Sequence, residues 1–287
     1  MSWIALTIEH RPLLEPLWKN LCLNHEIVLS EYSFANNYLF RQIHQYEVLL
    51  ENDFPLVKGI SRKGGAFILP TFDPSILPEK KLREILKIHP LYPIPNQWIP
   101  FFAALPVKKK CHRYQSDYLY AIEKLRELKG RKLSSRRNLL HQLQNDHHLE
   151  THSIRADDKQ AAHIILEGWQ KQSLVTAEQN DFYSCQEALL RMESFNLFGR
   201  ICLVDGAPGG FTLGEQLTPT TAILHFSKAL HQYKGLTPFL YEDFASNLTS
   251  ETRWINLEQD LDIPSLRQAK EAYEPDCLAN KWWIFLE

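Results

Sequence analysis

The first informative absence in this 287-residue sequence is that of any long apolar run. No stretch approaches the roughly 18 uninterrupted apolar residues that a membrane-spanning helix needs. The opening MSWIALTIEHRPLLEPLWKN has no basic leader, and its short apolar run soon meets Glu9, His10 and Arg11. A signal peptide is therefore not expected. We expect a protein without a transmembrane segment that resides in the cytoplasm.

Cysteine is scarce and irregularly spaced. An odd number at wide spacing, without any C-x-x-C, is unlike a disulfide framework or a zinc knuckle and suits a reducing compartment. The five cysteines are Cys22, Cys111, Cys185, Cys202 and Cys277.

Two common catalytic patterns are also missing. The sequence has no H-E-x-x-H, which zinc proteases use, and no G-x-S-x-G, which serine hydrolases use. His147, His148 and His152 lie where a strand is expected to begin, so we expect no metal site there.

Neither sign of charge is in excess, because 32 Lys and Arg face 34 Asp and Glu, for a net charge of −2. Binding to nucleic acid through the whole surface is not expected, and any site for a polyanion must be a local patch. The 44% apolar and 23% charged residues fit a globular protein.

Hydrophobic patterning predicts an N-terminal domain over residues 1–115 and a C-terminal domain over residues 116–287. The basic stretch KKKCHRYQSD marks the boundary. In the first domain we expect helices at 11–24, 30–43 and 77–89. We also expect strands at 46–52, 54–61 and 65–70, a turn at 51–53, and a buried strand at 96–106.

The second domain is predicted to begin with helices and to end with a sheet. Its helices are expected at 123–130, 131–146, 157–173 and 185–198, with a strand at 148–155. Three antiparallel strands follow over 200–230, then a helix after Gly235, a strand at 253–258, a helix at 264–275 and a strand at 281–287. The class is α+β, or mixed α/β, with largely antiparallel sheets.

This order of elements resembles that of the GNAT acyltransferase fold. In addition, SEYSFANNYLFR, SSRRNLL, TLGEQL, HFSKAL, WINLEQDLDIPSLRQAKEAYEP and KWW, in this order, resemble a bacterial family grouped with the C-terminal domain of phosphatidylglycerol lysyltransferase. The resemblance covers nearly the entire chain. It implies two GNAT-like domains in tandem. Membrane-anchored relatives move an amino acid from aminoacyl-tRNA to a lipid headgroup, and peptidoglycan-branching aminoacyltransferases resemble the chain more distantly.

The resemblance also implies a donor site at HQYKGLTPFL. GNAT enzymes hold the pyrophosphate of coenzyme A on a [Q/R]-x-x-G-x-[G/A] turn. Gln232 and Gly235 match two of its three fixed positions, and Thr237 stands at the third. Backbone N–H groups would hold the phosphates. The charge would come from Lys228, His231 and Lys234. Alternatively, Gly235 only supplies a positive φ at a tight turn.

Several residues are candidates for the chemistry. In GNAT enzymes a tyrosine at the place of Tyr273 can protonate the leaving thiolate, and Lys270 shares its helix face. Tyr273 could also simply pack against the sheet. Residues two apart in a strand point to one side, so Glu258 and Asp260 could enter one cleft as bases for an incoming amine. Two further candidates are the base Glu215 and the substrate-binding Asn256.

A basic segment offers a possible contact with tRNA. Arg136, Arg137 and Asn138 lie in an expected helix. Because Arg136 and Arg137 are about 100° apart around it, one of these two should face inward. With the other cations nearby in sequence they could form a track for an RNA backbone, or they could be ordinary solvated surface. The other cations are Arg131, Lys132, Lys108, Lys109, Lys110 and Arg113.

Two functions remain open from the sequence. The first is a transferase that moves an acyl or aminoacyl group from acyl-CoA or aminoacyl-tRNA, without a tightly bound cofactor, to an amine or hydroxyl of a small molecule or peptide. The second is a GNAT-like binding module that recognises a nucleotide, a peptide or a protein partner without turnover. Departures from the family pattern favour the second: Ser227 and Leu230 replace acidic residues, Leu257 an arginine, and Asp262 a glycine. Donor, acceptor and oligomeric state are left open.

Overall fold

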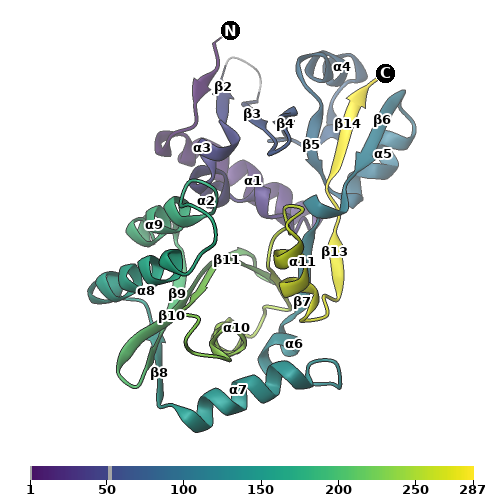
Figure 1. Ribbon diagram of the computed structural model, residues 1–287. Coiled ribbons are helices and arrows are strands. Elements are labelled where there is room, and N and C mark those ends of the chain that lie inside the picture. The colour runs from purple at the N-terminus through teal and green to yellow at the C-terminus, as the bar shows by residue number, and fades with distance from the viewer. Residues whose placement is uncertain (1, 51–53) are drawn as a thin grey trace. The chain divides into compact units, whose positions relative to one another are not determined.

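A computed structural model describes residues 2–50 and 54–287, and the chain divides into two units (Figure 1). Unit 1 contains the chain up to Asp117 together with Gln259–Pro264 and Leu278–Glu287, and unit 2 contains Tyr118–Glu258 and Ser265–Cys277. A single boundary after residue 115 would leave Gln259–Pro264 and Leu278–Glu287 in the second domain, whereas they belong to unit 1. The turn predicted at 51–53 lies outside the described residues.

Unit 1 is built on a seven-stranded sheet of order β1-β2-β3-β4-β5-β14-β6. Most neighbours are antiparallel, and β4 and β5 are parallel. The strands are β1 (Ile4–Ala5), β2 (Glu47–Leu49), β3 (Leu56–Ile60), β4 (Ala66–Leu69), β5 (Leu91–Ile94), β6 (Val107–Cys111) and β14 (Trp282–Leu286). The helices are α1 (Arg11–His25), α2 (Phe34–Leu39), α3 (Arg41–His44), α4 (Glu79–Ile88) and α5 (Ile99–Ala103).

The helices of unit 1 follow from their apolar spacing. In α4, Leu82, Ile85 and Leu86 are buried at the spacing of one helix face, and the helix ends just before Pro90. In α1, Trp18 is fully buried, and its indole Nε1 donates to the carbonyl of Pro70 at 2.9 Å. The strands expected near 46–52, 54–61 and 65–70 are present as β2, β3 and β4.

Two expectations for unit 1 are wrong. The apolar segment 96–106 forms α5 after a short 3₁₀ turn, because Pro100 fits the first turn of a helix, where its missing N–H costs nothing. The final strand, β14, pairs with β5 and β6 of unit 1 and not with strands of unit 2. There the Trp283 ring stacks on that of Tyr92 with centroids 4.3 Å apart.

Unit 2 carries the second seven-stranded sheet, of order β13-β7-β12-β11-β10-β9-β8. The chain runs antiparallel from β8 to β11, and β12 lies parallel to β11. The strands are β7 (Asp117–Ala121), β8 (Leu149–Ser153), β9 (Phe198–Val204), β10 (Ala207–Thr218), β11 (Thr221–Ala229), β12 (Trp254–Asn256) and β13 (Cys277–Ala279). The helices are α6 (Ile122–Glu127), α7 (Ser134–Asp146), α8 (Lys159–Lys171), α9 (Phe182–Leu190), α10 (Leu236–Ser246) and α11 (Pro264–Glu271).

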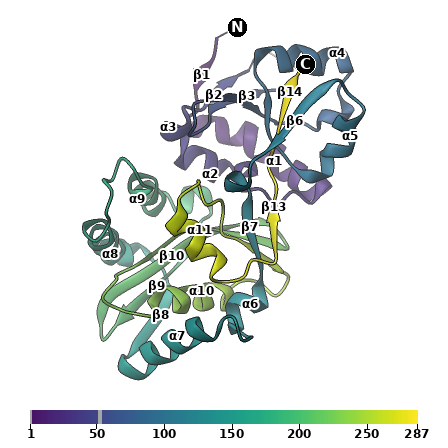
Figure 2. The same ribbon diagram turned by 45° about the vertical axis from the view of Figure 1, so that its right-hand side comes forward.

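Helices cover both faces of the sheet in unit 2 (Figures 1 and 2). α8 and α9 lie on one face, and α10 lies on the other with α6 and α7 against it. Leu236 and Leu240 of α10 are buried against Cys202 and Val204 of β9, and Leu143 of α7 joins this cluster. The structure is thus mixed α/β, with two mainly antiparallel sheets flanked by helices, as expected. Among the described residues, no helix is both long and apolar enough to cross a membrane.

Candidate active site

A β-bulge in β11 places one histidine where two carboxylates reach it. Leu213 pairs with Phe226 and Gly214 pairs with Leu224, so His225 is the extra residue between them. A bulge re-aims the side chain of its extra residue and increases the local twist of the strand. The side chain of His225 is fully buried.

The His225 ring bridges two glutamates. Its Nε2 lies 2.9 Å from Oε1 of Glu215, and its Nδ1 lies 2.8 Å from Oε1 of Glu258. Burial alone would lower the pKa of His225, but the hydrogen bonds to Glu215 and Glu258 outweigh it and raise the pKa from 6.5 to about 10. At neutral pH the ring is therefore an imidazolium that donates to both carboxylates.

Both carboxylates of this centre reach the surface. The side chains of Glu215 and Glu258 are 14% and 17% exposed, while that of His225 is 0% exposed. Two anions around one cation leave a net charge of −1 at a place that solvent or a ligand can reach. Such a centre attracts an ammonium group and can accept a proton from it.

The end of β12 fixes the position of Glu258. Asn256 is fully buried, and its Oδ1 accepts the backbone N–H of Glu258 at 2.6 Å. Glu258 itself has φ 59°, so the strand stops at Asn256 and does not run on to residue 258. Asn256 thus acts as a positioning residue for Glu258, and a direct contact with substrate is not needed to explain it.

The expectation that Glu258 and Asp260 share one side of a strand is wrong, because the left-handed turn at Glu258 breaks the alternation. Asp260 belongs to unit 1, where it is fully buried and pairs with Arg113 at 3.2 Å. Its Oδ1 also accepts the backbone N–H of Asp262 at 2.9 Å. These contacts give Asp260 a role in shaping the turn around it.

Some N–H groups of the predicted donor turn are bonded within the protein. The N–H of Leu236 donates to Tyr233 and that of His231 to the side chain of Gln172, while Pro238 has no N–H. Gly235 has φ 94°, and a Cβ added there would collide with the carbonyl oxygen of Leu139 in α7. This geometry favours the alternative that Gly235 serves a tight, closely packed turn.

The side chains predicted to contact the donor are divided between core and surface. Lys228 is 3% exposed, and its ammonium lies 2.6 Å from Oδ1 of Asp181 and 3.5 Å from the centre of the Trp169 ring. It is therefore occupied by an internal ion pair and a cation–π contact. The others, His231, Gln232, Lys234 and Thr237, are exposed.

Tyr273 lies two residues beyond the end of α11 and is only 4% exposed. Its ring contacts that of Tyr241 with centroids 5.0 Å apart. Burial raises the pKa of Tyr273 far above its ordinary value, which weakens it as an acid. Lys270 is 9% exposed and donates to the carbonyl of Leu257. Both placements favour a packing role over contact with substrate.

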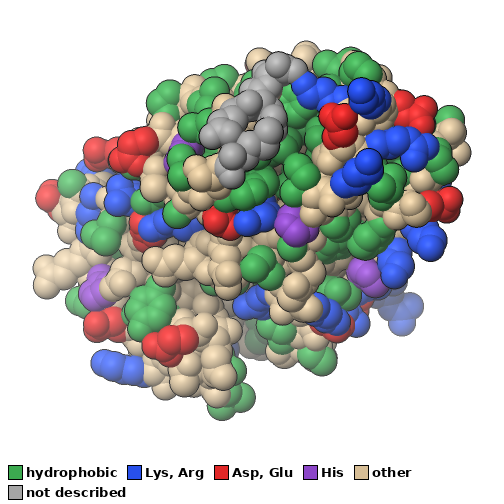
Figure 3. All heavy atoms as spheres, turned by 90° about the horizontal axis from the view of Figure 1, so that it is seen from above, with side chains coloured by type: hydrophobic (Ala, Val, Ile, Leu, Met, Phe, Trp, Pro, Cys, Tyr) green, Lys and Arg blue, Asp and Glu red, His purple; other side chains and the backbone are tan. Residues whose placement is uncertain are grey.

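The predicted RNA-binding residues lie in α7, but two of them make contacts within the protein. Arg137 donates to the carbonyl of Leu128 at 2.6 Å, and the Arg136 guanidinium lies 5.7 Å from the centre of the Tyr273 ring. Asn138 is exposed. In unit 1, Lys108–Lys110 are exposed on the edge strand β6, and Figure 3 shows Lys and Arg side chains on the right, where Figure 1 draws α4 and β6. Lysines on an edge strand also prevent unwanted strand pairing.

Sequence reasoning missed both buried cations of the molecule's carboxylate centres. His225 lies in HFSKAL, a segment that carries the family resemblance, but an alternating pattern does not reveal a bulge. Lys281 of unit 1 was also overlooked: it is fully buried, 2.7 Å from Oε2 of Glu31 and 2.5 Å from Oδ1 of Asp117. The signal available was that KWW and SEYS, which contain Lys281 and Glu31, lie in segments shared with the family. Over residues 2–50 and 54–287, no group of three His, Cys, Asp or Glu side chains is arranged to hold a metal ion.

Solved structures of the same fold cover nearly the whole chain. A conserved protein of unknown function from Bacteroides thetaiotaomicron has a TM-score of 0.84 at 22% identity and covers 100% of each chain. The C-terminal domain of a protein named lysylphosphatidylglycerol synthetase from Agrobacterium fabrum has a TM-score of 0.59 at 14% identity, with 95% of this chain and 93% of that chain covered.

L-PGS from Bacillus licheniformis has a TM-score of 0.54 at 11% identity, with 84% of this chain and 83% of that chain covered. No curated protein matches the sequence. At these identities the likeness to solved structures establishes the fold alone. The model of the family named phosphatidylglycerol lysyltransferase, C-terminal, matches residues 26–285. The chain therefore belongs to this family.

Proposed function

We propose that this protein transfers an aminoacyl group from an activated ester to an amine or hydroxyl acceptor. The observation that carries the proposal is the Glu215–His225–Glu258 centre, at the bulge of β11 beside the end of β12. Its net negative charge and partial exposure suit an ammonium-bearing substrate. Membership in the phosphatidylglycerol lysyltransferase family supports an aminoacyl donor.

The three side chains have different tasks in this proposal. His225 stays protonated at neutral pH, so it is not the base, and it fixes the direction of both carboxylates. Glu215 or Glu258 accepts a proton from the attacking group. An amine attacks only in its neutral form, so a carboxylate that removes a proton from the ammonium generates the nucleophile.

The reaction proceeds by direct attack. The amine nitrogen, or the hydroxyl oxygen, forms a bond to the ester carbonyl carbon and gives a tetrahedral intermediate. The bond from that carbon to the ester oxygen then breaks. The proton held by the carboxylate passes to the departing oxygen. With an amine acceptor, the nitrogen then gives its remaining extra proton to the emptied carboxylate, which returns it to water, so one proton is released for each ammonium consumed.

The predicted coenzyme A site is the reason to prefer an ester donor. In the turn before α10 the N–H groups of His231, Tyr233 and Leu236 are bonded within the protein, and its glycine is packed against α7. Lys228 is paired with Asp181. A pyrophosphate gains less here than on a helix N-terminus with open N–H groups, and an aminoacyl-tRNA donor does not require that cradle.

The test is a transfer assay with two donor classes. The protein is mixed with radiolabelled aminoacyl-tRNAs, and separately with labelled acetyl-CoA, each with a panel of amine and hydroxyl acceptors. We expect label to leave the tRNA only. Glu258→Gln and Glu215→Gln should each lower the transfer rate by about 100-fold or more, as loss of a general base does. Glu251→Gln, an exposed glutamate of unit 2, is the matched control.

Two results would overturn the proposal. Transfer from acetyl-CoA alone would return the donor site to coenzyme A. Equal rates in the Glu215, Glu258 and Glu251 variants would remove the centre from the chemistry. If no donor is used at all, the binding-module hypothesis becomes the better account of the protein.

A further inference from the structure

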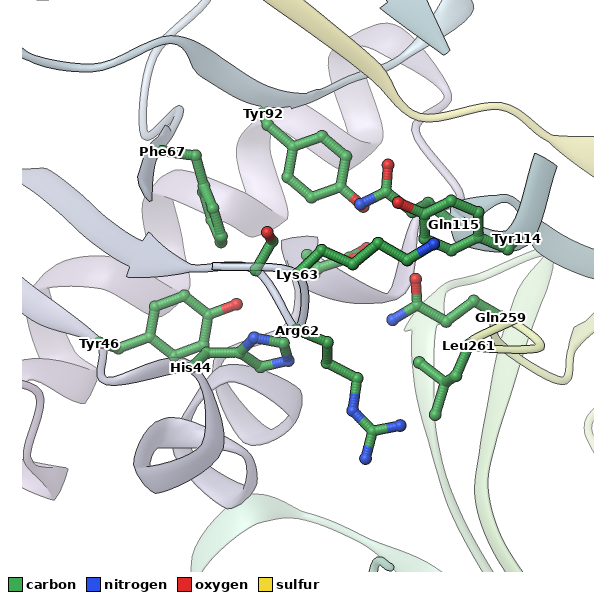
Figure 4. Close-up of a pocket in the computed structure, with 12 residues that line it drawn as sticks. His44, Tyr46, Arg62, Lys63, Phe67, Tyr92, Tyr114, Gln115, Gln259 and Leu261 are labelled. Atoms are coloured by element: carbon green, nitrogen blue, oxygen red, sulfur yellow. The ribbon is translucent and has the colours of Figure 1, made fainter. Parts of the chain in front are cut away.

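Unit 1 contains a pocket that the transfer mechanism does not use (Figure 4). Its empty space, counted together with the open solvent at its mouth, is about 490 Å³. Residues from β4, β5 and the segments before β2 and after β3 line it, and Figure 4 shows the Tyr46, Phe67 and Tyr92 rings around it with His44 beside Tyr46. Every lining residue lies in unit 1.

The inner end of the pocket has more negative than positive charge. Glu31 lines the pocket, and its two oxygens lie 2.8 and 2.7 Å from the ammonium of Lys281. Oδ1 of Asp117 lies 2.5 Å from the same ammonium. With all three ionised, a buried charge of −1 remains, and a buried charge is costly unless it is compensated.

A proton on Glu31 is one way to remove this charge. Burial, opposed by Lys281 and reinforced by Asp117, raises the pKa of Glu31 to about 7. The other route is a second cation supplied by a ligand. A carboxyl with this pKa is partly protonated at neutral pH, and an arriving cation can replace that proton.

The walls of the pocket suit a cation. The aromatic rings meet edge to face: Tyr46 and Phe67 have centroids 6.1 Å apart, and Phe67 and Tyr92 have centroids 5.2 Å apart. Burial raises the pKa of Tyr46 and Tyr92 well above the ordinary value, so both stay neutral. Ring faces of this kind attract ammonium groups.

His44 adds a neutral acceptor. Burial lowers the pKa of His44, so the ring is uncharged near neutral pH. Its Nδ1 lies 2.9 Å from the carbonyl oxygen of Ile60 and must carry the hydrogen, because a carbonyl only accepts. Nε2 is then the acceptor nitrogen of the ring, and it adds to the acceptors available for an N–H donor.

Cations are found at the exposed mouth. Arg62 and Lys63 line the pocket and are both exposed. Lys63 pairs with Asp262 at 2.9 Å and lies 4.1 Å from the centre of the Tyr114 ring. The charge therefore changes from negative at the inner end to positive at the mouth. That polarity matches a ligand whose ammonium enters first and whose carbonyl or anionic remainder stays outside.

We propose that this pocket binds the primary ammonium group of an amino acid or aminoacyl ligand against Glu31. The recognition of an ammonium rests on the pocket alone, and only the choice of aminoacyl ligands rests on the proposed function. The site is separate in sequence and in unit from Glu215, His225 and Glu258. It would select substrates by their amino group and does not take part in bond breaking.

Binding then displaces the proton of Glu31. The groups that face this carboxylate are Lys281, Asp117, Tyr46, Tyr92, His44, Arg62 and Lys63. Because only the ionised form pairs with an ammonium, the ligand must compete with a proton below pH 7. We expect the Kd, calculated for the ammonium form of the ligand, to be about tenfold higher at pH 6 than at pH 8.

The experiment is isothermal titration calorimetry on the whole chain without any donor. The ligands are amino acid amides with small, apolar, aromatic and basic side chains, together with their N-acetylated forms and simple alkylamines. Each titration is run at pH 6 and pH 8, and in two buffers of different ionisation enthalpy to count released protons. We expect at least one amide to bind, its N-acetylated form to bind at least about tenfold more weakly, and proton release to be seen at pH 6.

The variant is Glu31→Gln, which imitates the protonated carboxyl and keeps the Lys281–Asp117 pair. It should weaken amide binding by at least about tenfold and abolish the proton release. Glu47→Gln is the control, since Glu47 belongs to unit 1 and pairs with Lys58 outside the pocket. The comparisons with N-acetylated ligands and across pH use the unaltered protein, so they decide the matter even if the variant does not fold.

The outcomes separate the sources of the ammonium. Binding of amides but not alkylamines identifies the α-amino group of an aminoacyl ligand, and equal binding of alkylamines identifies a side-chain amine. Both support the site. Equal binding of acetylated and free amides, or no binding of any amine, would overturn it. Either of these failures would leave the transfer assay intact, since that assay depends on Glu215 and Glu258.

Discussion

The two units each bury one cation between two carboxylates, yet the two centres solve the charge problem differently. In unit 1, Lys281 lies between Glu31 and Asp117, and these side chains are at most 8% exposed. In unit 2, His225 lies between Glu215 and Glu258, whose side chains are 14% and 17% exposed. In the first centre burial raises the pKa of Glu31 to about 7, so a proton offsets part of the excess negative charge at neutral pH. In the second centre contact with solvent offsets it.

This difference shows that the same set of charges can serve two purposes. A lysine keeps its charge at physiological pH, and the pKa of Lys281 is raised because Asp117 and Glu31 outweigh the lowering by burial. A buried histidine stays protonated at neutral pH only while neighbouring carboxylates raise its pKa, so the charge of the second centre depends on Glu215 and Glu258. We therefore expect unit 1 to depend on its cation for stability, and unit 2 to depend on its carboxylates for chemistry.

The largest expected effect comes from breaking the first centre. Lys281→Met leaves two carboxylates buried without a counter-ion, and the free energy of unfolding should fall by about 3–5 kcal/mol. Urea denaturation followed by circular dichroism measures it. Lys19→Met, which breaks an exposed pair with Glu15, should cost no more than about 1 kcal/mol. Equal losses in the two variants would show that the buried centre is not special.

The second centre should be less costly to break. In His225→Gln the two glutamates lose their cation, but both can turn toward water, so we expect a loss of about 2–3 kcal/mol. His147→Gln removes an exposed histidine that pairs with Asp205 and is the matched control in unit 2. A loss in His225→Gln as large as in Lys281→Met would contradict the importance of exposure.

The pH dependence of stability sharpens the same comparison. The pKa of His225 is raised from 6.5 in the unfolded chain to about 10 in the fold, so the folded state binds the proton more tightly. Its contribution is fully present below pH 6.5 and is lost as the pH rises toward 10, by up to about 1.4 kcal/mol for each pH unit. Urea unfolding between pH 6 and 9.5 should show this slope in the unaltered protein. The slope should be shallower in His225→Gln, and parallel curves would refute the assignment.

The smallest effect is expected from the residue that positions Glu258. Asn256→Ala removes the acceptor of the Glu258 N–H and should cost about 1 kcal/mol. Because Glu258 is then held less firmly, the pKa of His225 should fall, which NMR titration of the ring can detect. Asn247→Ala, at an exposed site where the side chain donates to Asp243, should leave that pKa unchanged. An unchanged His225 pKa in both variants would mean that Asn256 does not position Glu258.

Much of the regular secondary structure could be predicted from the sequence. Helix α4 and strands β2 to β4 follow apolar spacing and nearby prolines and glycines, which act within a few residues. The segment 96–106 could not be read in this way, since a short apolar run suits a strand and a helix equally. Its prolines decided the outcome.

The candidate site was predicted in part. Glu215 and Glu258 were named as bases, whereas His225 between them was not, because the bulge depends on how β10 and β11 pair. Lys228 and Tyr273 were placed by resemblance to a fold, but their burial depends on Asp181, Trp169 and Tyr241, which come from other elements. The close packing of Gly235 against α7, which disfavours a phosphate site there, likewise depends on another element.

The sequence by itself determined the class of fold, the family and most of the local elements, because these depend on periodicity and on interactions between near neighbours. Only the tertiary structure decided which charges meet. It brought Lys281 to Glu31, 250 residues away along the chain, and turned His225 toward Glu215 and Glu258. The physical reason is that a buried ion pair requires desolvated partners within about 4 Å, and that distance is set by packing and strand register, not by sequence separation.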